Sequence, residues 1–389
     1  MLNQIVHPLA LSDITTIAET GGACAGKSTV LAQSTRHLQD KGVHACVVPE
    51  IATEFATHGL SFGDFGSPED FQTQILLASV EREYRYHQAM KCIKAKHKVI
   101  LTDRGRLDGS AYISPDVFFK MAEKLGYDAA LLGEVPYKGV IYLRSLAYDA
   151  PHLYTCANNI ARRETVEEAK ELDERTLRSW IHHPHLVVIS NTDGNGGFID
   201  LQTKVRKSVA AITHILGIPV PIEIERKFHL KNEPLISVPH ENVSIVQYYI
   251  KTPEGDERIR MRTWRGITTC YRTIKKTLPG FSGSFGRYET ESIITASEFT
   301  RLLRFAKPDC CPVTKTRKTF VYKDQYFELD VFLGLHQGLV MLEIELTDAN
   351  DQVSLPDFLG KSRDVTDDLD YSNYSLARNP SLSSLWKNC

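Results

Sequence analysis

The sequence predicts two units of different fold: an α/β unit with a mostly parallel, doubly wound sheet, and then an antiparallel β barrel with accessory helices. In the first half of the chain, short apolar runs alternate with longer helical stretches, which is the pattern of β–α units. In the second half, many short segments alternate polar and apolar residues, as antiparallel strands do when one face is buried. We therefore expect a first domain at 12–216, a linker at 217–221, a second domain at 222–378 and a tail at 379–389.

The strands of the first domain are predicted from runs that are rich in β-branched residues. Four runs, at 44–50, 97–103, 139–143 and 186–190, are short and uninterrupted, as expected for strands buried on both faces of a parallel sheet. A fifth run, at 14–19, is less apolar, and it is predicted as a strand because of the glycine-rich segment that follows it.

The bulk composition excludes several classes of protein. The chain has 389 residues, of which 42% are hydrophobic and 24% charged, with a net charge of −2, so no overall field draws it to nucleic acid or to a membrane. Its eight cysteines are scattered, without CxxC pairs, which predicts reduced thiols. No signal-peptide pattern opens the sequence, and no apolar run approaches the roughly 20 residues that span a bilayer. We expect a cytoplasmic protein, with peripheral membrane contact or a nuclear location as the alternatives.

Residues 21–28 read GGACAGKS and fit the phosphate-loop (P-loop) pattern G-x4-G-K-[ST]. The glycines let backbone N–H groups approach phosphate oxygens, and the helix that begins at Lys27 directs the positive end of its dipole at them. Lys27 is expected to reach the β- and γ-phosphates, and the Ser28 hydroxyl is expected to bind Mg²⁺. The alternative is a glycine-rich turn that arose by chance, which the preceding strand and the following helix argue against.

Charged residues stand where two predicted strands end. Asp103 closes the run 97–103, and Glu50 closes the run 44–50. Because the carboxyl ends of parallel strands line the ligand crevice, Asp103 can hold Mg²⁺ or act as a base, and Glu50 can orient an acceptor hydroxyl. Arg104 can pair with a phosphate. For either acid, the alternative is a helix N-cap or a solvated loop charge.

A highly charged helical stretch at 158–175 contains Arg162 and Arg163. On a small-molecule kinase such a stretch is a lid whose arginines neutralise the transferring phosphoryl group, and the alternative is an exposed helix with i,i+4 ion pairs. Asn191 can read a base edge or close a turn. The predicted catalytic residues are Lys27, Asp103, Arg162 and Glu50. The predicted nucleotide-binding residues are Gly21, Gly22, Ala23, Cys24, Ala25, Gly26, Lys27, Ser28, Thr29, Arg104 and Asn191.

Together these motifs resemble the P-loop domain shared by bacterial ribosylnicotinamide kinase and the TRPL translocation defect protein family. The resemblance covers residues 14–216 and rests on GGACAGKST at 21–29, PE at 49–50, DRG at 103–105 with Asp108, and the segment HP-x-L-x-VI-x-N at 183–191. Ala23 and Ser28 stand where proline and threonine are usual in that family, and neither change removes a phosphate contact.

Charged residues recur at alternate positions along the strands of the second domain. Arg258, Arg260 and Arg262 share parity, and so do Glu343 and Glu345, so each set lies on one face of its strand. For any one strand, the alternative is a solvated face. Whole strands are acidic and others are basic, however, and closure of the sheet would turn this face into a lumen. A tunnel with opposed acidic and basic walls suits a metal-chelated polyphosphate.

This ordered set resembles the CYTH, or triphosphate tunnel metalloenzyme, family over residues 221–378. It rests on the motifs E-x-E-x-K at 223–227, R-I-R at 258–260, T-x-K at 273–275, R-x-E-x-E at 287–291, K-x-R at 315–317, E-x-D at 328–330 and E-x-E at 343–345. The resemblance implies an eight-stranded tunnel that holds Mg²⁺ or Mn²⁺ and, in hydrolytic members, attack by metal-activated water. The predicted metal ligands are Glu223, Glu225, Asp330, Glu343 and Glu345 in this domain, and Ser28 and Asp103 in the first. The predicted triphosphate-binding residues are Lys227, Arg258, Arg260, Arg262, Lys275, Arg287, Lys315 and Arg317.

Three functions are open at this point. The first is an enzyme, either a triphosphate hydrolase or a small-molecule kinase. The second is a binding module, because the order of the two domains resembles the TRPL translocation defect proteins, which implies binding of GTP and of an anionic headgroup such as a phosphoinositide or phosphatidate in membrane trafficking. The third is a nucleotide-stabilised scaffold. The nucleotide can be GTP or ATP, since no NKxD-type guanine motif is visible. The whole-chain resemblance favours GTP-dependent, lipid-linked trafficking, whereas residue chemistry favours phosphohydrolase or kinase.

Overall fold

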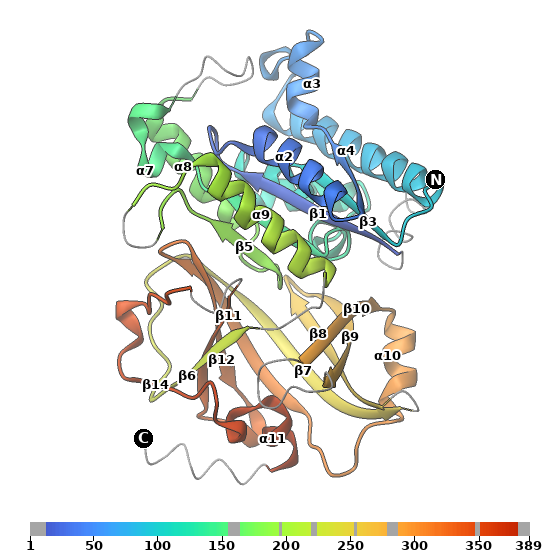
Figure 1. Cartoon of the computed structure of the whole chain (residues 1–389), viewed down its shortest axis with the longest axis vertical. Coiled ribbons are helices and arrows are strands. Elements are labelled where there is room, and N and C mark those ends of the chain that lie inside the picture. The colour runs from blue at the N-terminus through green and yellow to red at the C-terminus, as the bar shows by residue number, and fades with distance from the viewer. Residues whose placement is uncertain are drawn as a thin grey trace. The chain divides into compact units, whose positions relative to one another are not determined.

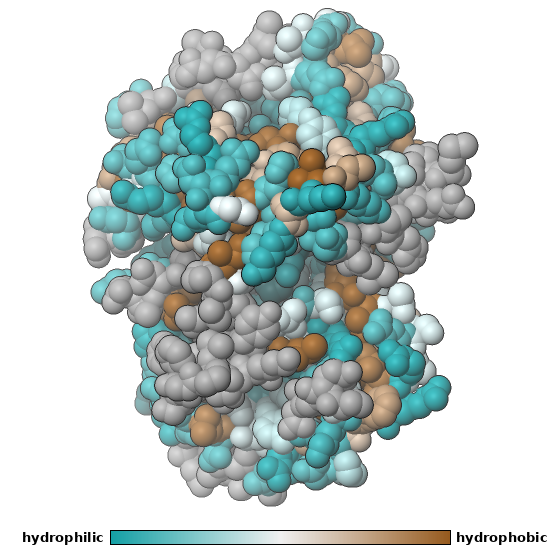
Figure 2. Space-filling view, turned by 45° about the vertical axis from the view of Figure 1, so that its right-hand side comes forward, coloured by the Kyte–Doolittle hydropathy of each residue, from teal (hydrophilic) through white to brown (hydrophobic). Residues whose placement is uncertain are grey.

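The computed structural model describes residues 13–154, 164–193, 197–218, 224–252, 255–277, 287–346 and 351–379. The chain forms two compact units, Met1–Leu216 and Gly217–Cys389 (Figure 1). On the face shown in Figure 2, hydrophilic side chains predominate over the described surface, and hydrophobic ones appear between them. Among the described helices, none is long and apolar enough to cross a membrane.

The first unit is built on a five-stranded parallel sheet in the order β2-β3-β1-β4-β5. Its strands are β1 (Ile14–Gly21), β2 (Val43–Val48), β3 (His97–Asp103), β4 (Gly139–Leu143) and β5 (Leu186–Ile189). Each predicted run therefore overlaps one of these strands. The chain passes from β1 to β2 and β3 on one side and then crosses to β4 on the other side, so β1 lies at the switch point where α/β sheets bind ligands.

Helices cover both faces of this sheet. The helices are α2 (Lys27–Asp40), α3 (Ile51–Thr57), α4 (Pro68–Lys91), α5 (Pro115–Lys124), α6 (Ala129–Leu132), α7 (Leu146–Asp149), α8 (Val166–Arg178) and α9 (Leu201–Leu216), with 3₁₀ turns η1 (Phe62–Asp64), η2 (Arg106–Ala111) and η3 (Pro151–Leu153). Successive side chains of β1 point to opposite faces. Glu19 meets Ser208 of α9, whereas Thr20 meets Asp108 of η2. The doubly wound α/β prediction is confirmed.

The second unit is a nine-stranded antiparallel sheet in the order β10-β9-β8-β7-β11-β12-β13-β6-β14. Its strands are β6 (Glu225–Leu230), β7 (His240–Thr252), β8 (Gly255–Trp264), β9 (Ile267–Thr277), β10 (Arg287–Ile294), β11 (Val313–Tyr322), β12 (Gln325–Phe332), β13 (Val340–Glu345) and β14 (Ser362–Asp364). The eight strands implied by the CYTH resemblance are all present. The ninth, β14, is a three-residue strand beyond the eight that the resemblance implies. This antiparallel sheet is consistent with a CYTH tunnel barrel.

The two faces of the second sheet differ in chemistry. One face buries apolar residues such as Phe228, Phe320 and Leu342 in a core, and α10 (Ala296–Leu303) packs Phe299 and Leu302 against another part of this face. Two 3₁₀ turns, η4 (Gly334–His336) and η5 (Asp357–Leu359), lie in its connections. The other face carries the charged residues.

The C-terminal segment packs against one end of the charged face. This segment comprises η6 (Leu369–Tyr371) and α11 (Asn373–Arg378). Its Leu376 and Ala377 join a buried cluster with Phe332 and Met341, and the ring of Tyr374 lies 5.0 Å from that of Tyr249 on β7. The apolar cluster therefore lines one end of a face that is otherwise charged.

Candidate functional sites

The phosphate-loop motif connects β1 to α2, as the sequence predicts. Gly26 adopts a left-handed conformation with φ of 87° and precedes α2 directly, a geometry that favours glycine. Gly22 is required for a different reason, because a Cβ atom there would lie 2.2 Å from the Asp173 carboxylate. The loop thus leads directly into the N-terminus of α2, which is the arrangement that binds phosphates.

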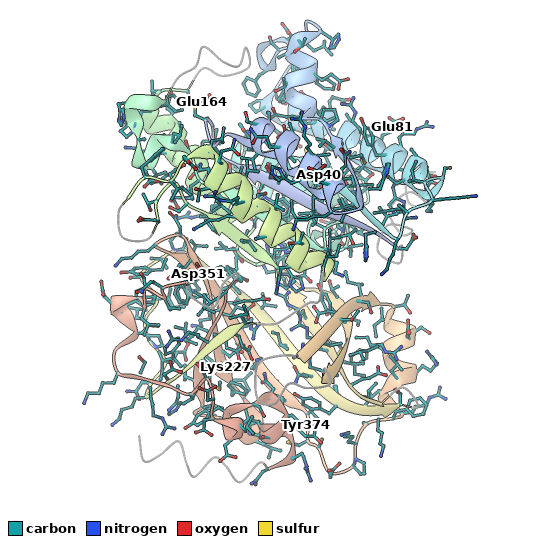
Figure 3. All side chains as sticks on the ribbon, viewed as in Figure 1. Asp40, Glu81, Glu164, Lys227, Asp351 and Tyr374 are labelled. Carbon is teal, nitrogen blue, oxygen red and sulfur yellow. The ribbon has the colours of Figure 1, made fainter. Side chains whose placement is uncertain are left out.

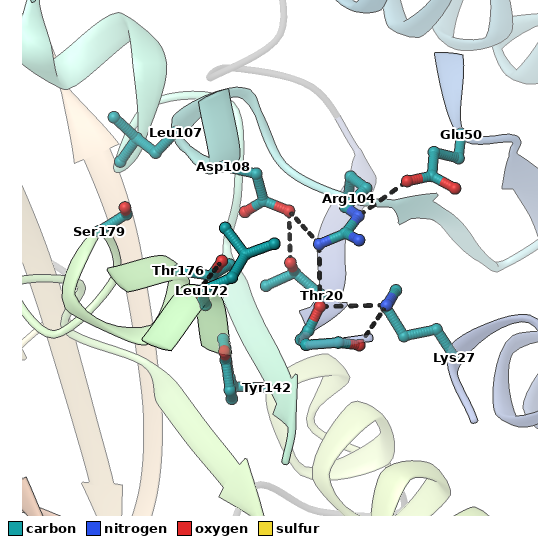
Figure 4. A network of polar contacts seen from close by, with 12 residues as sticks. Thr20, Lys27, Glu50, Arg104, Leu107, Asp108, Tyr142, Leu172, Thr176 and Ser179 are labelled. Atoms are coloured by element: carbon teal, nitrogen blue, oxygen red, sulfur yellow. Dashed lines mark hydrogen bonds and ion pairs between the residues drawn. The ribbon is translucent and has the colours of Figure 1, made fainter. Parts of the chain in front are cut away.

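Lys27, the first residue of α2, turns its ammonium group back over the loop (Figure 4). Its Nζ donates to the carbonyl oxygens of Gly21 at 3.0 Å and Gly22 at 2.8 Å. Burial and the neighbouring Arg104 charge lower the pKa of Lys27 to about 8. The ammonium group is therefore held by the same loop that would hold a phosphate.

Ser28 and Asp103 come together at the carboxyl end of β3. The Ser28 hydroxyl donates to Asp103 Oδ2 at 3.5 Å, a weak bond at the limit of hydrogen-bond distance. Among the described residues, the other oxygen of Asp103 is buried without a hydrogen-bond partner. Burial and the charge of Glu50 raise the pKa of Asp103 to about 6. A hydroxyl and an unsatisfied carboxylate oxygen form a hard-oxygen donor set that fits Mg²⁺.

Arg104 and Glu50 form an ion pair beside the loop. Arg104 Nε donates to Glu50 at 2.9 Å, and the Thr53 hydroxyl donates to the other Glu50 oxygen at 2.5 Å. Burial alone would raise the pKa of Glu50, but Arg104 and Lys27 lower that pKa to about 2. Glu50 occupies the N-cap position of α3, yet its side chain makes no capping bond to the helix backbone. The carboxylate is thus committed to the network around the loop.

The loop is also supported from β4, by residues that the sequence did not single out. The Ser145 hydroxyl donates to the carbonyl of Ala23 at 2.5 Å. Asp173 of α8 accepts from the Ser145 backbone N–H at 3.3 Å and pairs with Arg144 at 2.8 Å. Arg144 and Ser145 directly follow the predicted strand at 139–143. The rule that residues at the carboxyl ends of parallel strands line the ligand crevice, which pointed to Glu50, therefore applies to them as well.

Asn191 lies in this supporting layer. It is buried, and its amide nitrogen donates to the Ser145 carbonyl at 2.9 Å and to Asp149 at 2.8 Å. These bonds connect Asn191 to the segment that follows β4. Arg162 lies outside the described residues. The charged stretch that contains it is described only from residue 164 onward, where it forms the start of α8.

In the second unit, the register of the strands gathers the predicted charges on one face. Arg317 on β11 is directly opposite Asp330 on β12, and Glu343 on β13 is directly opposite Lys227 on β6, which is labelled in Figure 3. Directly opposite residues lie on the same side of a sheet. The described charged side chains that the register places on this face include Glu225, Lys227, Arg258, Arg260, Arg262, Glu291, Lys315, Arg317, Glu328, Asp330, Glu343 and Glu345.

Arg317 is the centre of the charged face. Its guanidinium donates to both oxygens of Asp330, each at 2.7 Å, to Glu343 at 3.0 Å and to Glu328. Lys315 donates to Asp330 as well. Both oxygens of Asp330 are therefore bonded to cationic side chains.

A second ion-pair group lies on β8, β9 and β10. Glu291 accepts from Arg260 at 2.7 Å and from the Thr273 hydroxyl at 2.9 Å, and lies 3.7 Å from Arg258. Glu291 belongs to the R-x-E-x-E motif at 287–291, but it was not among the predicted site residues. The side chains of Lys275 and Arg287 lie outside the described part of the structure, although β9 and β10 include both residues.

Carboxylates that fit a divalent cation converge on β6 and β13. Glu225 and Glu345 are directly opposite each other, a placement of like charges that is unfavourable without a cation. Lys227 contacts Glu225 at 2.9 Å and Glu343 at 3.4 Å. Glu223 lies outside the described residues. Within the described ranges, no three His, Cys, Asp or Glu side chains are grouped closely enough to hold a metal ion by themselves.

The fold and these two sites define a protein with two phosphate-binding architectures: a P-loop α/β unit and an antiparallel sheet with one charged face. Residues 16–195 match the family model of an AAA domain, and residues 221–379 match that of the CYTH domain. Through its second unit the chain belongs to the CYTH family, because this unit aligns with almost the full length of a relative to which it is more than 30% identical.

That relative is an inorganic triphosphatase of Acetivibrio thermocellus. It is 35% identical over 160 residues, which are 41% of this chain and 94% of the relative. An inorganic triphosphatase of Nitrosomonas europaea is 34% identical over 161 residues, which are 40% of this chain and 96% of that protein. Among solved structures, the crystal structure of the inorganic triphosphatase NE1496 is 29% identical and covers 40% of this chain and 94% of its own, with a TM-score of 0.27.

Proposed function

We propose that the protein is a metal-dependent triphosphate hydrolase through its second unit and a binder of Mg-nucleoside triphosphate, GTP or ATP, through Gly21–Thr29 of its first unit. The observation that carries the proposal is the charged face centred on Arg317, where basic side chains that suit phosphate oxygens alternate with carboxylates that suit a hard cation. The names of the relatives agree with hydrolysis of an inorganic triphosphate.

In this proposal, Glu225, Glu343 and Glu345 hold Mg²⁺ or Mn²⁺ together with Glu223. The metal would lower the pKa of a bound water and thereby supply the nucleophile. Phosphate oxygens are bound by the basic residues of the same face, whose fixed charges stabilise the negative charge that develops on the transferring group. The basic residues are Lys227, Arg258, Arg260, Arg262, Lys275, Arg287, Lys315 and Arg317. Asp330 orients two of them and is not a metal ligand in this scheme.

The test is phosphate release from tripolyphosphate, ATP and GTP with Mg²⁺ or Mn²⁺. Tripolyphosphate hydrolysis that survives Lys27→Ala and is lost in Glu343→Gln/Glu345→Gln supports the assignment to the second unit. Glu233→Gln is the matched control, because Glu233 is an exposed carboxylate of the same unit. Hydrolysis that disappears with Lys27→Ala alone places the chemistry in the first unit, as in an NTPase or a small-molecule kinase.

The second candidate is a GTP- and anionic-phospholipid-linked binding protein of the TRPL translocation defect family. The order of its two units favours this candidate, since a face that binds phosphates can also bind a phosphoinositide or phosphatidate headgroup. Nucleotide binding without phosphate release from any substrate, combined with binding to vesicles that contain phosphatidate but not to phosphatidylcholine vesicles, would support it over hydrolysis.

A further inference from the structure

Arg104 has an unusual backbone for its position. It directly follows β3, and its φ of 83° lies in the left-handed region, which costs a non-glycine residue free energy. Its backbone N–H donates to the carbonyl of Glu19 on β1 at 3.1 Å. A residue that keeps such a conformation does so because its surroundings stabilise it, so the contacts of the Arg104 side chain are informative.

The guanidinium of Arg104 joins three segments of the chain (Figure 4). It donates to the carbonyl of Gly21 at the end of β1 at 2.8 Å and to Glu50 after β2 at 2.9 Å. It also lies 3.6 Å from Asp108 of η2. Asp108 is itself fixed, because it accepts from the Thr20 hydroxyl at 2.5 Å and from the Trp180 indole at 2.6 Å.

The carbonyl of Gly21 explains why this arrangement matters for phosphate binding. It accepts from Arg104 Nη1 at 2.8 Å and also from Lys27 Nζ at 3.0 Å. When Lys27 turns to a phosphate, Arg104 still donates to the carbonyl of Gly21, so this buried acceptor keeps a partner. If Arg104 itself turned to the phosphate, both the ion pair with Glu50 and the bond to Gly21 would be lost.

Resting on the proposed nucleotide binding by the first unit, we propose that Arg104 is a positioning residue that fixes the phosphate loop to Glu50 and Asp108, and that its guanidinium stays on these protein groups instead of contacting the phosphates. This assignment replaces the expectation from the sequence that Arg104 pairs with a phosphate. It makes Arg104 act through the geometry of the loop, and therefore equally on every nucleotide that the loop binds.

The test compares Kd values for Mg-ATP and Mg-ADP, and for Mg-GTP and Mg-GDP, in full-length wild type and Arg104→Gly. Glycine accepts a φ of 83°, so this change removes the side chain without adding backbone strain. Arg265→Gly is the matched control, because Arg265 is a second arginine with positive φ, in a turn of the other unit. We expect Arg104→Gly to weaken di- and triphosphate binding by the same factor, about tenfold, and Arg265→Gly to change neither.

A direct phosphate contact gives a different pattern. If Arg104→Gly weakens triphosphate binding at least about fivefold more than diphosphate binding, the guanidinium contacts the terminal phosphate and the inference is overturned. It is also overturned if no Kd changes. Low-millimolar guanidinium ion is expected to restore affinity to Arg104→Gly and to leave wild type unchanged, which a general loss of stability would not produce.

Glu50→Gln provides a second route if Arg104→Gly does not fold. The inference predicts that Glu50→Gln weakens nucleotide binding when Arg104 is present but weakens it little further in a chain that already carries Arg104→Lys. The reason is that lysine cannot bridge Glu50 and the Gly21 carbonyl as a guanidinium does. Fully additive effects contradict it. If wild type and Lys27→Ala alike bind no nucleotide, the proposed function fails. If wild type binds, Lys27→Ala does not and Arg104→Gly behaves as wild type, only the inference about Arg104 fails.

Discussion

Replacing Asp330 by asparagine is expected to destabilise the second unit strongly. Asp330 is fully buried, and its two oxygens accept from Lys315 Nζ and from Arg317 Nε and Nη2, the latter two at 2.7 Å. Asparagine keeps the shape of the side chain, but it removes the negative charge and turns an N–H₂ group toward two cations. The perturbation is therefore electrostatic rather than steric.

The structure sets the size of this effect. Removing one partner of a buried ion pair costs about 3–5 kcal/mol. Arg317 keeps Glu328 and Glu343, whereas Lys315 keeps a contact of 3.4 Å with the neutral Asn373. The loss of stabilising charge is thus concentrated on Lys315. Burial lowers the pKa of Lys315, and Asp330 is the main group that opposes this shift. We expect the lower end of the range, about 3 kcal/mol, which corresponds to an increase of about 100-fold in the opening equilibrium.

Hydrogen exchange measured by mass spectrometry can resolve this effect in the intact chain. Backbone amides of β11, β12 and β13 should exchange about 100-fold faster in Asp330→Asn, while those of β1, β3 and β4 should be unchanged. Asp367→Asn is the control, because Asp367 is exposed in the same unit. Equal protection of β11–β13 in the two variants would refute the reasoning, since it would mean that the charge of Asp330 is not needed to stabilise the buried cations Lys315 and Arg317.

The same variant separates the two roles considered for Asp330. If Asp330 orients the cations, Asp330→Asn should bind Mn²⁺ nearly as well as wild type, and tripolyphosphate should restore part of the lost protection by supplying negative charge to Lys315 and Arg317. A large loss of Mn²⁺ affinity with tripolyphosphate binding preserved would instead make Asp330 a metal ligand.

Three further predictions concern the first unit and its ligands. Burial raises the pKa of Glu19 from 4.5 to about 8, so ionisation of this carboxyl lowers the free energy of unfolding. In urea denaturation, Glu19→Gln should therefore be more stable than wild type, by a difference that grows from pH 4.5 to about 8 and is constant above it. A difference that does not depend on pH would contradict this. Gly22→Ala places a Cβ 2.2 Å from Asp173 and should cost about 1–3 kcal/mol and abolish nucleotide binding in calorimetry, whereas Gly63→Ala, which meets no atom within 4 Å, should be neutral for both. In hydrogen exchange, Mg-ATP or Mg-GTP should protect the loop before α2 and leave β11–β13 unaffected, and tripolyphosphate should do the reverse; protection of both regions by one ligand would contradict two separate sites.

Local pattern was enough to predict the side of the sheet on which each charge lies. The alternation at Arg258, Arg260 and Arg262 survives in the structure because a strand has only two faces, and the register then aligns the faces of neighbouring strands. The glycine loop was predictable for a similar reason, since its function needs particular residues at fixed spacing before a helix.

Pairing between distant segments was not predictable in this way. Arg317 contacts acids from two other strands, and the choice of Asp330 as its principal partner depends on register rather than on any local motif. Asp173 supports the phosphate loop from α8 without a local signal. The role of Arg104 depends on a positive φ and on the carbonyl of Gly21, neither of which a side-chain pattern specifies.

Glu343 connects the two halves of the proposed chemistry. It lies 3.4 Å from Lys227 and 3.0 Å from Arg317, and although burial would raise its pKa, these cations and Lys315 hold that pKa well below its usual range. A metal ion that approaches alone must therefore compete with Lys227 and Arg317 for the carboxylate. In the proposed function, a triphosphate would attract the same two cations and so lower the cost of transferring Glu343 to the metal. Because linkage is reciprocal, a metal bound to Glu343 would release these cations for phosphate, and we expect the charged face to favour the metal–triphosphate complex over either ligand by itself.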